Sequence, residues 1–421
     1  MVVFAPGRLR GATGVPGDKS ISHRALIAGA RCNAPLHIAN MNPGRDVEAT
    51  RAGLLALGVR IERLGDQTVV HPSSVATPAR VLDCANSGST ARMLLGACAG
   101  AGIAADFDGD ESLRRRPMEP VAAQLRAFGA KIATTGGRLP ARLEGTPEVQ
   151  TRHFILLSPS AQIKSALLFA SLYGGVAVRV AGDRGSRDHT ERLLRYLGAD
   201  IEWDGREVRL GTAPLHGGEL EVAGDPSAAA FFITAAAVAG GSAVVIRNVD
   251  TNPTRTGLLE ALQLMGAAIE LRNPRTRYGE PVADIAVEQR PLQGAAIGAD
   301  LALRAIDEIP LLAVAAAFAS GTTTIAGVSD LRTKESDRIA AIARLLAAVG
   351  IGCTVSGRGL AIEGGQPTAQ GTVIETHDDH RIVMAAAVLA CAAGPLRVDS
   401  AASVAVSFPR FEETLAELQA G

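Results

Sequence analysis

Several short segments of the chain combine side chains that bind anions or transfer protons. Lysine occurs only four times among 421 residues, yet Lys19, Lys164 and Lys334 each lie in such a segment. Arginine supplies the other positive charges, but an ammonium group, unlike a guanidinium, has a pKa that can fall far enough for proton transfer. The three segments read PGDKSISHRAL, SPSAQIKSALL and LRTKESDRI. They predict sites for phosphate or carboxylate groups beside a proton donor.

Two further segments carry dense hydrogen-bond donors at predicted helix starts. NSGSTARML begins at Asn86, and its Gly88 leaves room for a ligand to approach the backbone. DESLRRRPM contains three consecutive arginines, and Pro117 suits the first position of a helix, which would place Arg116 at the positive end. In PGDKSISHRAL, Asp18 or Ser20 can cap the helix. Free N–H groups and the helix dipole make such ends anion sites.

Carboxylates accompany these cations in two segments. AIDEIPLL places Asp307 before a very apolar run, where it is either a helix cap or a proton acceptor. In LRTKESDRI, a helix beginning at Lys334 would place Arg338 one turn later on the same face, with Glu335 beside them. Together the segments predict pockets for several anionic groups, with two carboxylates for proton transfer.

The segment THDDHRIVM contains two histidines and two aspartates, a composition that also occurs in metal sites. His377 and His380 are three residues apart, but no third group of ligands follows elsewhere in the chain. Arg381 at the start of an apolar helix instead indicates another anion-binding position. We therefore expect neither a metal nor a cofactor.

A repeat of about 70 residues positions these segments. Each unit ends an amphipathic helix with a glycine and continues into a strand, and each contains an earlier alanine-rich helix. The glycines suit the left-handed position after a helix. They are Gly58, Gly129, Gly198, Gly266, Gly350 and Gly421. Six units of helix, strand, helix, strand and strand exceed one core, so we expect an α/β protein with two domains of three units.

Composition excludes several classes of protein. The net charge of −1 and 3% aromatic residues argue against a nucleic-acid partner. Five widely spaced cysteines without a CxxC motif argue against a disulfide framework. The start of the chain lacks a signal peptide, and the apolar runs are shorter than the ~20 residues that span a bilayer. We therefore expect a cytoplasmic protein.

These motifs together resemble the 5-enolpyruvylshikimate-3-phosphate synthase family over essentially the whole chain. The motifs PGDKSISHRAL, NSGSTARML, RRRPM, SAQIKSALL, RDHTE, DEIP, LRTKESDR, DDHR and SFP match in order, and the KES and SAQ forms are similar to the bacterial class II group. The resemblance implies a two-domain inside-out α/β barrel of six βαβαββ repeats. It places repeats 4–6 in residues 1–15 and 224–421, repeats 1–3 in residues 16–223, and the active site in the cleft between the domains.

The implied reaction transfers the enolpyruvyl group of phosphoenolpyruvate to the 5-hydroxyl of shikimate 3-phosphate and releases phosphate. It passes through a tetrahedral intermediate and belongs to chorismate and aromatic amino acid biosynthesis. By resemblance, Asp307 accepts the hydroxyl proton, Glu335 exchanges a proton with the methylene carbon, and Lys19 contacts both substrates. The implied shikimate 3-phosphate site comprises Lys19, Ser20, Arg24, Ser160, Ala161, Gln162, Ser186, Arg187, Asp307 and Lys334. The implied phosphoenolpyruvate site comprises Lys19, Asn86, Gly88, Arg116, Gln162, Arg338, His380 and Arg381.

The chain departs from the family pattern at three positions. Val406 stands where many members have a lysine that contacts phosphoenolpyruvate, Ala161 where others have a second serine, and Met93 where many have proline. In relatives a larger residue at the position of Gly88 hinders glyphosate, so we expect glyphosate to compete with phosphoenolpyruvate here. We expect a monomer without a nucleic-acid or membrane partner.

Two alternatives to this function stay open on the sequence. A UDP-N-acetylglucosamine 1-carboxyvinyltransferase shares the fold, but it uses a reactive cysteine in the loop that here reads DESLRRRPM. A non-catalytic repeat scaffold would keep the repeat glycines, but it would not need lysines and paired acids at helix starts.

Overall fold

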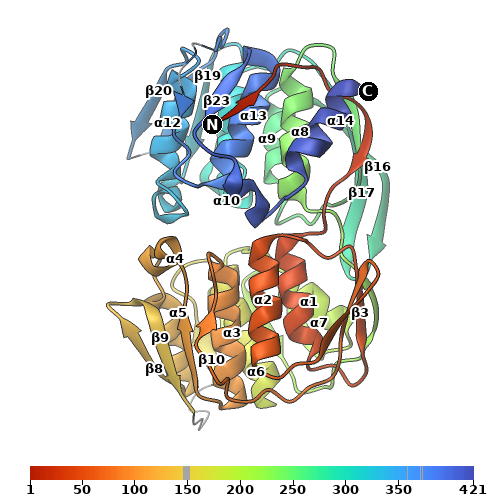
Figure 1. The fold of residues 1–421 in the computed structure, drawn as a ribbon, viewed down its shortest axis with the longest axis vertical. Coiled ribbons are helices and arrows are strands. Elements are labelled where there is room, and N and C mark those ends of the chain that lie inside the picture. Colours follow the sequence, from red (N-terminus) through yellow and green to blue (C-terminus); the bar gives the residue numbers. More distant parts are fainter. Residues whose placement is uncertain (146–151, 358, 370, 372) are drawn as a thin grey trace. The chain divides into compact units, whose positions relative to one another are not determined.

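The computed structural model describes residues 1–145, 152–357, 359–369, 371 and 373–421 (Figure 1). The chain divides into two compact units. Unit 1 comprises residues 1–16, 223–275 and 281–421, and unit 2 comprises residues 17–222 and 276–280. The sequence-based division places residues 276–280 with the rest of 224–421. These residues form the tip of the hairpin of β16 (Ala268–Arg277) and β17 (Glu280–Glu288), and they group with unit 2 although the rest of the hairpin belongs to unit 1.

Unit 2 contains three four-stranded sheets. In each, a first strand runs parallel to a second, and an antiparallel hairpin completes the sheet. The first sheet has the order β14 (Gly218–Glu221), β3 (Leu36–Ala39), β5 (Gln67–Val70), β4 (Ile61–Leu64). The second has the order β6 (Leu82–Asp83), β7 (Ala105–Asp108), β9 (Arg138–Glu144), β8 (Lys131–Thr135). The third has the order β10 (His153–Ile155), β11 (Val178–Ala181), β13 (Glu207–Leu210), β12 (Ile201–Trp203).

Three buried helices form the centre of unit 2, each preceded by a polar segment from the sequence motifs. They are α1 (Lys19–Gly29), α3 (Gly88–Ala101) and α6 (Ala161–Gly174). The more exposed helices are α2 (Arg45–Ala56), α4 (Glu111–Arg115), α5 (Glu119–Phe128) and α7 (His189–Tyr196). Helices α3 and α6 approach closely, because a Cβ atom on Gly96 would lie 2.2 Å from the carbonyl oxygen of Ala166. Glycine is therefore required at this contact.

Unit 1 also contains three sheets. One has the order β16 (Ala268–Arg277), β17 (Glu280–Glu288), β15 (Ala243–Asp250), β2 (Arg10–Gly14). The next has the order β18 (Ala296–Ile297), β19 (Thr322–Ala326), β21 (Gly359–Glu363), β20 (Cys353–Ser356). The last is three-stranded, with the order β1 (Val2–Phe4), β23 (Leu396–Val398), β22 (Val373–Ile374).

This last sheet corrects one expectation. The repeat predicted two strands after the second helix of every unit, but the sixth unit has no such hairpin in the described residues. Strand β1 pairs antiparallel with β23 in its place, with Val2 opposite Val398. The sixth sheet is therefore built from both ends of the sequence.

The central helices of unit 1 are alanine-rich and almost fully buried. They are α8 (Pro226–Val238), α11 (Ile309–Ala317) and α13 (His380–Ala393). The remaining helices are α9 (Gly257–Leu264), α10 (Ala299–Arg304), η1 (Ser329–Thr333), α12 (Arg338–Ala347), η2 (Ala402–Val406) and α14 (Phe411–Ala420). Each unit has its own hydrophobic core. Among the described residues, no helix is both long and apolar enough to cross a membrane.

The repeat glycines adopt the backbone conformation that the sequence predicts. The φ angles are 89° at Gly58, 122° at Gly129, 90° at Gly198, 91° at Gly266 and 76° at Gly350. Each of these glycines follows the second helix of its unit, where a left-handed residue turns the chain into the next strand. The prediction is confirmed for these five.

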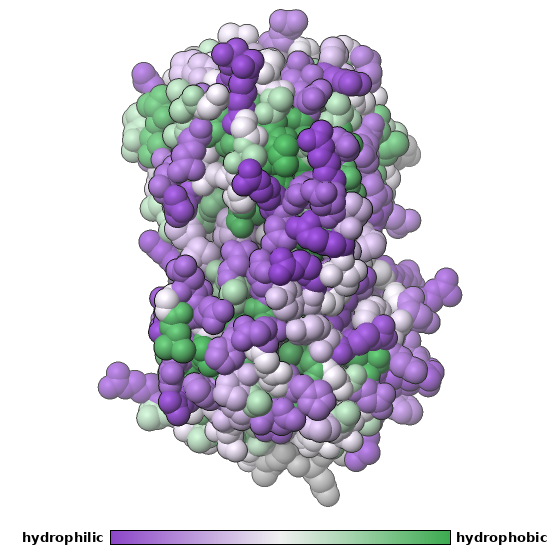
Figure 2. Space-filling model, turned by 90° about the vertical axis from the view of Figure 1, so that its right-hand side faces the viewer, coloured by the Kyte–Doolittle hydropathy of each residue, from purple (hydrophilic) through white to green (hydrophobic). Residues whose placement is uncertain are grey.

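Figure 2 shows that polar side chains cover much of one face of the molecule, with apolar side chains in separate groups among them.

Candidate active site

The amino ends of α1 and α2 meet in unit 2 through an ion pair. Asp18 caps α1 by accepting a hydrogen bond of 2.8 Å from the N–H of Ile21, so Asp18 and not Ser20 is the cap. Lys19 is the first helical residue, and its Nζ lies 2.9 Å from Oδ2 of Asp46 in the first turn of α2. The Lys19 ammonium is thus held at a helix end while about a fifth of its side chain stays exposed, at 19%.

The amino end of α3 carries the second predicted cluster. Ser87 caps the helix and Gly88 is its first residue. Asn86 accepts a hydrogen bond of 2.6 Å from Nη2 of Arg116, and its own amide donates to Asp110 at 2.6 Å. Arg116 does not precede a helix as predicted. It is the C-cap of α4, which ends at Arg115, and Pro117 is not the first helical residue, since α5 begins at Glu119.

The amino end of α6 joins this cluster through Gln162. The Ser160 hydroxyl caps α6, and Ala161 is the first helical residue. Gln162 donates to the hydroxyl of Ser89 at 3.0 Å and accepts from Nη1 of Arg92 at 2.6 Å. The predicted residues Gln162, Asn86 and Gly88 therefore belong to one polar cluster.

Arg92 is a site residue that our sequence interpretation missed. A Cβ atom on Gly88 would lie 2.5 Å from its Nη1 and 3.7 Å from Nη1 of Arg116, so both guanidinium groups approach the glycine. The signal in the sequence is the spacing of four residues between Gly88 and Arg92, which places them on one helix face. The adjacent Met93 is fully buried in the core of unit 2.

A third group of predicted residues surrounds Arg24 on α1. Its guanidinium donates to Thr190 at 2.6 Å, to Ser165 at 2.8 Å and to the carbonyl oxygen of Ser20 at 2.8 Å. Ser186 lies in the segment between Asp183 and α7, close in sequence to Thr190, and its N–H donates to Asp183 at 3.2 Å. The predicted residue Arg187 follows it and is half-buried.

Lys164 does not have the role that its motif indicated. Its Nζ lies 2.6 Å from both Asp183 and Glu191, and its side chain is 2% exposed. Burial alone would lower its pKa, but the two carboxylates outweigh burial and the net shift is upward. Lys164 is therefore a structural cation and not a proton donor.

In unit 1, three cations surround the carboxylate of Asp307. Its oxygens lie 3.9 Å from Nζ of Lys334, 3.7 Å from Nη1 of Arg338 and 3.8 Å from Nη2 of Arg381. Asp307 does not occupy the N-cap position of α11, which is taken by Glu308. The alternative of a plain helix cap is therefore wrong for Asp307.

Arg338 organises the acids of this cluster. It lies 2.5 Å from Glu335 and 2.8 Å from Asp379, and its side chain is 1% exposed. Burial alone would raise the pKa of Asp379, but the guanidinium outweighs it and the net shift is downward. Arg338 is the first residue of α12, so Lys334 lies before the helix and does not begin it as predicted.

The amino end of α13 supplies the remaining residues predicted for unit 1. Asp379 caps the helix by accepting from the N–H of Arg381 at 3.0 Å, and His380 is buried beside it. Arg381 also donates to the carbonyl oxygen of Asp307 at 2.9 Å. Val406, where the family pattern has lysine, ends η2 and is half-buried.

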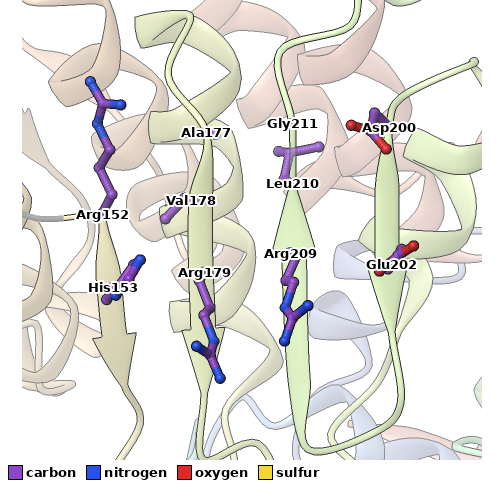
Figure 3. A pocket seen from close by; sticks show the side chains of 10 residues that line it. All are labelled: Arg152, His153, Ala177, Val178, Arg179, Asp200, Glu202, Arg209, Leu210 and Gly211. Atoms are coloured by element: carbon purple, nitrogen blue, oxygen red, sulfur yellow. The ribbon is translucent and has the colours of Figure 1, made fainter.

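A separate cavity of about 560 Å³ contains none of the predicted residues. It lies over the sheet β10–β11–β13–β12, and Figure 3 shows side chains from all four strands on this face. Arg179 and Arg209 both pair with Glu207, at 2.5 Å and 2.6 Å. Exposed pairs of this kind are typical of a solvated sheet face.

The chain matches one enzyme family over nearly its whole length. The sequence profile of EPSP synthase (3-phosphoshikimate 1-carboxyvinyltransferase) matches residues 3–415. A 3-phosphoshikimate 1-carboxyvinyltransferase of Bradyrhizobium diazoefficiens is 44% identical over 97% of this chain and 90% of that protein. One from an Anaeromyxobacter species is 44% identical over 96% of this chain and 95% of that protein.

Solved structures agree with this match. EPSP synthase from Acinetobacter baumannii superposes with a TM-score of 0.88 and 38% identity, covering 99% of this chain and 98% of that one. The enolpyruvyl transferase NikO from Streptomyces tendae has a TM-score of 0.75 at 19% identity, over 99% of this chain and 96% of that one, and shows the fold alone. The fold is the two-domain enolpyruvyl transferase fold. The chain belongs to the EPSP synthase family and is a transferase of the shikimate pathway.

Proposed function

We propose that this chain transfers the enolpyruvyl group of phosphoenolpyruvate to the 5-hydroxyl of shikimate 3-phosphate and releases phosphate. The observation that carries the proposal is the carboxylate of Asp307 held within 4 Å of Lys334, Arg338 and Arg381. A general base surrounded by cations can accept a proton from a hydroxyl group while the cations bind the anionic substrates.

Three residues have catalytic roles in this proposal. Asp307 removes the proton of the 5-hydroxyl group. Glu335 delivers a proton to the methylene carbon of phosphoenolpyruvate in the addition step and takes one back in the elimination step. The ion pair with Arg338 at 2.5 Å fixes the position of the Glu335 carboxylate. Lys19 contacts both substrates with its ammonium, which Asp46 orients.

The binding roles follow the remaining clusters. We propose that Ser20, Arg24, Ser160, Ala161, Gln162, Ser186, Arg187 and Lys334 hold shikimate 3-phosphate. We propose that Asn86, Gly88, Arg92, Arg116, Gln162, Arg338, His380 and Arg381 hold phosphoenolpyruvate. Support comes from the amino ends of α1, α3, α6 and α13, where N–H groups and arginines favour anions. Residues of both units would contribute to the binding of this pair of substrates.

The competing enolpyruvyl transfer to UDP-N-acetylglucosamine lacks its nucleophile here. All five cysteines lie outside the loop of residues 110–118, where that activity requires one. Cys98 is fully buried, and burial raises the pKa of its thiol to about 12. A scaffold without activity is disfavoured because buried ionic groups such as Arg338 cost free energy that packing alone would not require.

We further propose that the enzyme works as a monomer in the cytoplasm without metal or cofactor. Its five cysteines are all free, which suits a reducing compartment. Purified protein should elute as a single monomeric species in size-exclusion chromatography with light scattering, and a dimer would contradict this part of the proposal.

Mixing the protein with both substrates tests the main proposal. We expect release of phosphate that requires shikimate 3-phosphate and phosphoenolpyruvate together, with formation of the enolpyruvyl product detected by mass spectrometry. Replacing shikimate 3-phosphate with UDP-N-acetylglucosamine is the control and should give no phosphate. Binding of both substrates without any product would contradict the proposal.

A further inference from the structure

A buried ionic triad in unit 2 takes no part in the chemistry proposed above. Lys164, Asp183 and Glu191 have side chains that are 2%, 4% and 1% exposed, and the Lys164 ammonium lies 2.6 Å from each carboxylate. Transferring three charged groups from water into a core costs free energy, and apolar side chains of similar volume are often as stable. A triad at this place therefore indicates a requirement beyond packing.

The triad joins three elements that carry predicted substrate contacts. Lys164 lies in the first turns of α6, Asp183 follows β11, and Glu191 lies in the first turn of α7. The 2.6 Å contacts fix the spacing and rotation of these elements at their amino ends.

A second polar layer lies directly beside the triad. Ser165 follows Lys164, Thr190 precedes Glu191, and their hydroxyl groups are 2.7 Å apart. Both accept hydrogen bonds from the guanidinium of Arg24, at 2.8 Å and 2.6 Å. The elements that the triad joins therefore also carry the two hydroxyl groups that contact the Arg24 guanidinium.

Asp183 also orders the segment that follows it. One carboxylate oxygen contacts Lys164, and the other accepts the N–H of Ser186 at 3.2 Å. The Ser186 hydroxyl has no hydrogen-bond partner within the described residues and is shielded from solvent. A group arranged in this way can donate to an incoming ligand.

We propose that the Lys164–Asp183–Glu191 triad is a positioning device that presents Arg24 and Ser186 to shikimate 3-phosphate. The inference rests on the proposed function. The three residues do not touch the substrate; they act through the two that do. Arg24 and Ser186 belong to the proposed shikimate 3-phosphate site and not to the proposed phosphoenolpyruvate contacts, so we expect the triad to affect the affinity for shikimate 3-phosphate more than that for phosphoenolpyruvate.

The two acids of the triad have unequal tasks. Asp183 bonds to both Lys164 and the N–H of Ser186, whereas the Glu191 carboxylate forms an ion pair with Lys164. Burial raises the pKa of Glu191. Glu191→Gln keeps the shape of the side chain and should be tolerated, because Asp183 is the acid that holds the N–H of Ser186, whereas Asp183→Asn should disturb the Ser186 segment.

Steady-state kinetics with each substrate varied separately tests the proposal. For Lys164→Met and Asp183→Asn we expect the KM for shikimate 3-phosphate to rise at least about tenfold, with kcat and the KM for phosphoenolpyruvate within about twofold of wild type. For Glu191→Gln the KM should change less than about threefold. Glu119→Gln, which removes an exposed pair with Arg126 in the same unit, is the control and should match wild type.

A neutral triple variant covers the case in which Lys164→Met fails to fold. Lys164→Met/Asp183→Asn/Glu191→Gln leaves no buried unpaired charge, and its KM for shikimate 3-phosphate should still be raised. A folded variant with wild-type KM, or a uniform loss of kcat and both affinities, would overturn the positioning role. Wild-type enzyme without turnover would instead refute the proposed function, so the two failures are distinguishable.

Discussion

The buried helices of unit 1 are joined at their amino ends by an ion pair between charged side chains, whereas those of unit 2 are joined by bonds between cations and neutral groups. In unit 1, Glu308 of the α11 cap contacts Arg381 of α13 at 3.5 Å and the hydroxyl of Ser227 of α8. Ser227 also accepts from Arg255 at 2.9 Å. These groups are buried.

In unit 2, cations contact neutral partners: Arg24 of α1 donates to Ser165 of α6 at 2.8 Å, and Arg92 of α3 donates to Gln162 of α6 at 2.6 Å. His23 of α1 bonds to Thr50 of α2 at 2.7 Å, and Thr50 bonds to Thr90 of α3 at 2.6 Å. Burial, together with the charges of Lys19 and Arg24, lowers the pKa of His23 well below its ordinary value, so its ring is uncharged.

This difference separates two tasks of one reaction. Buried cations and acids in unit 1 create a strong local field around Asp307, which suits proton transfer. In unit 2, cations bonded to neutral groups lie near the amino ends of helices, which suits binding of anionic groups. Substitutions should therefore affect turnover most in unit 1 and affinity most in unit 2.

The largest expected effect is on Asp307 in unit 1. Asp307→Ala removes the proposed base and should lower kcat by about 10²–10⁴-fold while shikimate 3-phosphate still binds. Single-turnover kinetics and isothermal titration measure the two quantities. Turnover that stays near wild type would remove Asp307 from this role.

The next effect concerns the close contact between α3 and α6 in unit 2. Gly96→Ala would place a Cβ atom 2.2 Å from the carbonyl oxygen of Ala166, and we expect unit 2 to be destabilised by about 1–3 kcal/mol. Thermal unfolding measures this loss. Gly240→Ala is the matched control, because no atom lies within 4 Å of its added Cβ, and an equal loss in both variants would contradict the explanation.

A smaller effect is expected at the amino end of α3. Gly88→Ala should push aside the Arg92 guanidinium, whose Nη1 lies 2.5 Å from the added Cβ. We expect the KM for phosphoenolpyruvate to rise roughly tenfold, about 1.4 kcal/mol, with little change in kcat.

Inhibition by glyphosate can be measured on wild type and on the same Gly88→Ala variant. In wild type glyphosate should compete with phosphoenolpyruvate, and in Gly88→Ala its inhibition constant should rise more than the KM. Inhibition that is not competitive in wild type would show that glyphosate does not occupy this cluster.

The smallest expected effect concerns the free energy of unfolding, to which Asp379 of unit 1 and Glu191 of unit 2 contribute with opposite pH dependence. The pKa of Asp379 is lowered on folding, so its stabilisation is present above the unfolded value of about 3.9 and is lost as the pH falls through the folded value. The pKa of Glu191 is raised, so its contribution is present below the unfolded value of about 4.3 and is lost as the pH rises through the folded value.

Two variants measure these opposite slopes. The melting temperature of Asp379→Asn should fall less steeply than that of wild type on acidification below about pH 4, whereas that of Glu191→Gln should fall less steeply as the pH rises above about pH 4. If the melting temperatures of both variants and wild type changed with pH in parallel, the opposite directions of the two pKa shifts would be contradicted.

The sequence predicted the repeat and the site because both depend on local patterns. Glycines such as Gly58 and Gly129 follow their helices at a fixed place in each unit, and their positive φ angles confirm the reason. The cluster of Asp307, Lys334, Glu335, Arg338 and Arg381 was also predicted, through motifs at helix starts.

Long-range pairings were not predictable in this way. The helix start was placed at Lys334 instead of Arg338, because the cap at Asp337 competes with several other polar residues nearby. The partners of Lys164 lie in other elements, so nothing adjacent in the sequence indicates them. The pairing of β1 with β23 joins three residues to a strand almost 400 positions away, which no local pattern encodes.

The pairing of β1 with β23 has a consequence for synthesis of the protein on the ribosome. Residues 17–222, nearly all of unit 2, emerge as one stretch and can begin to fold early. Strand β1 emerges before them but has no sheet partner until residues 396–398 are made. Unit 1 must therefore complete its folding last. The three residues of β1 have no strand to pair with during almost the entire translation of the chain.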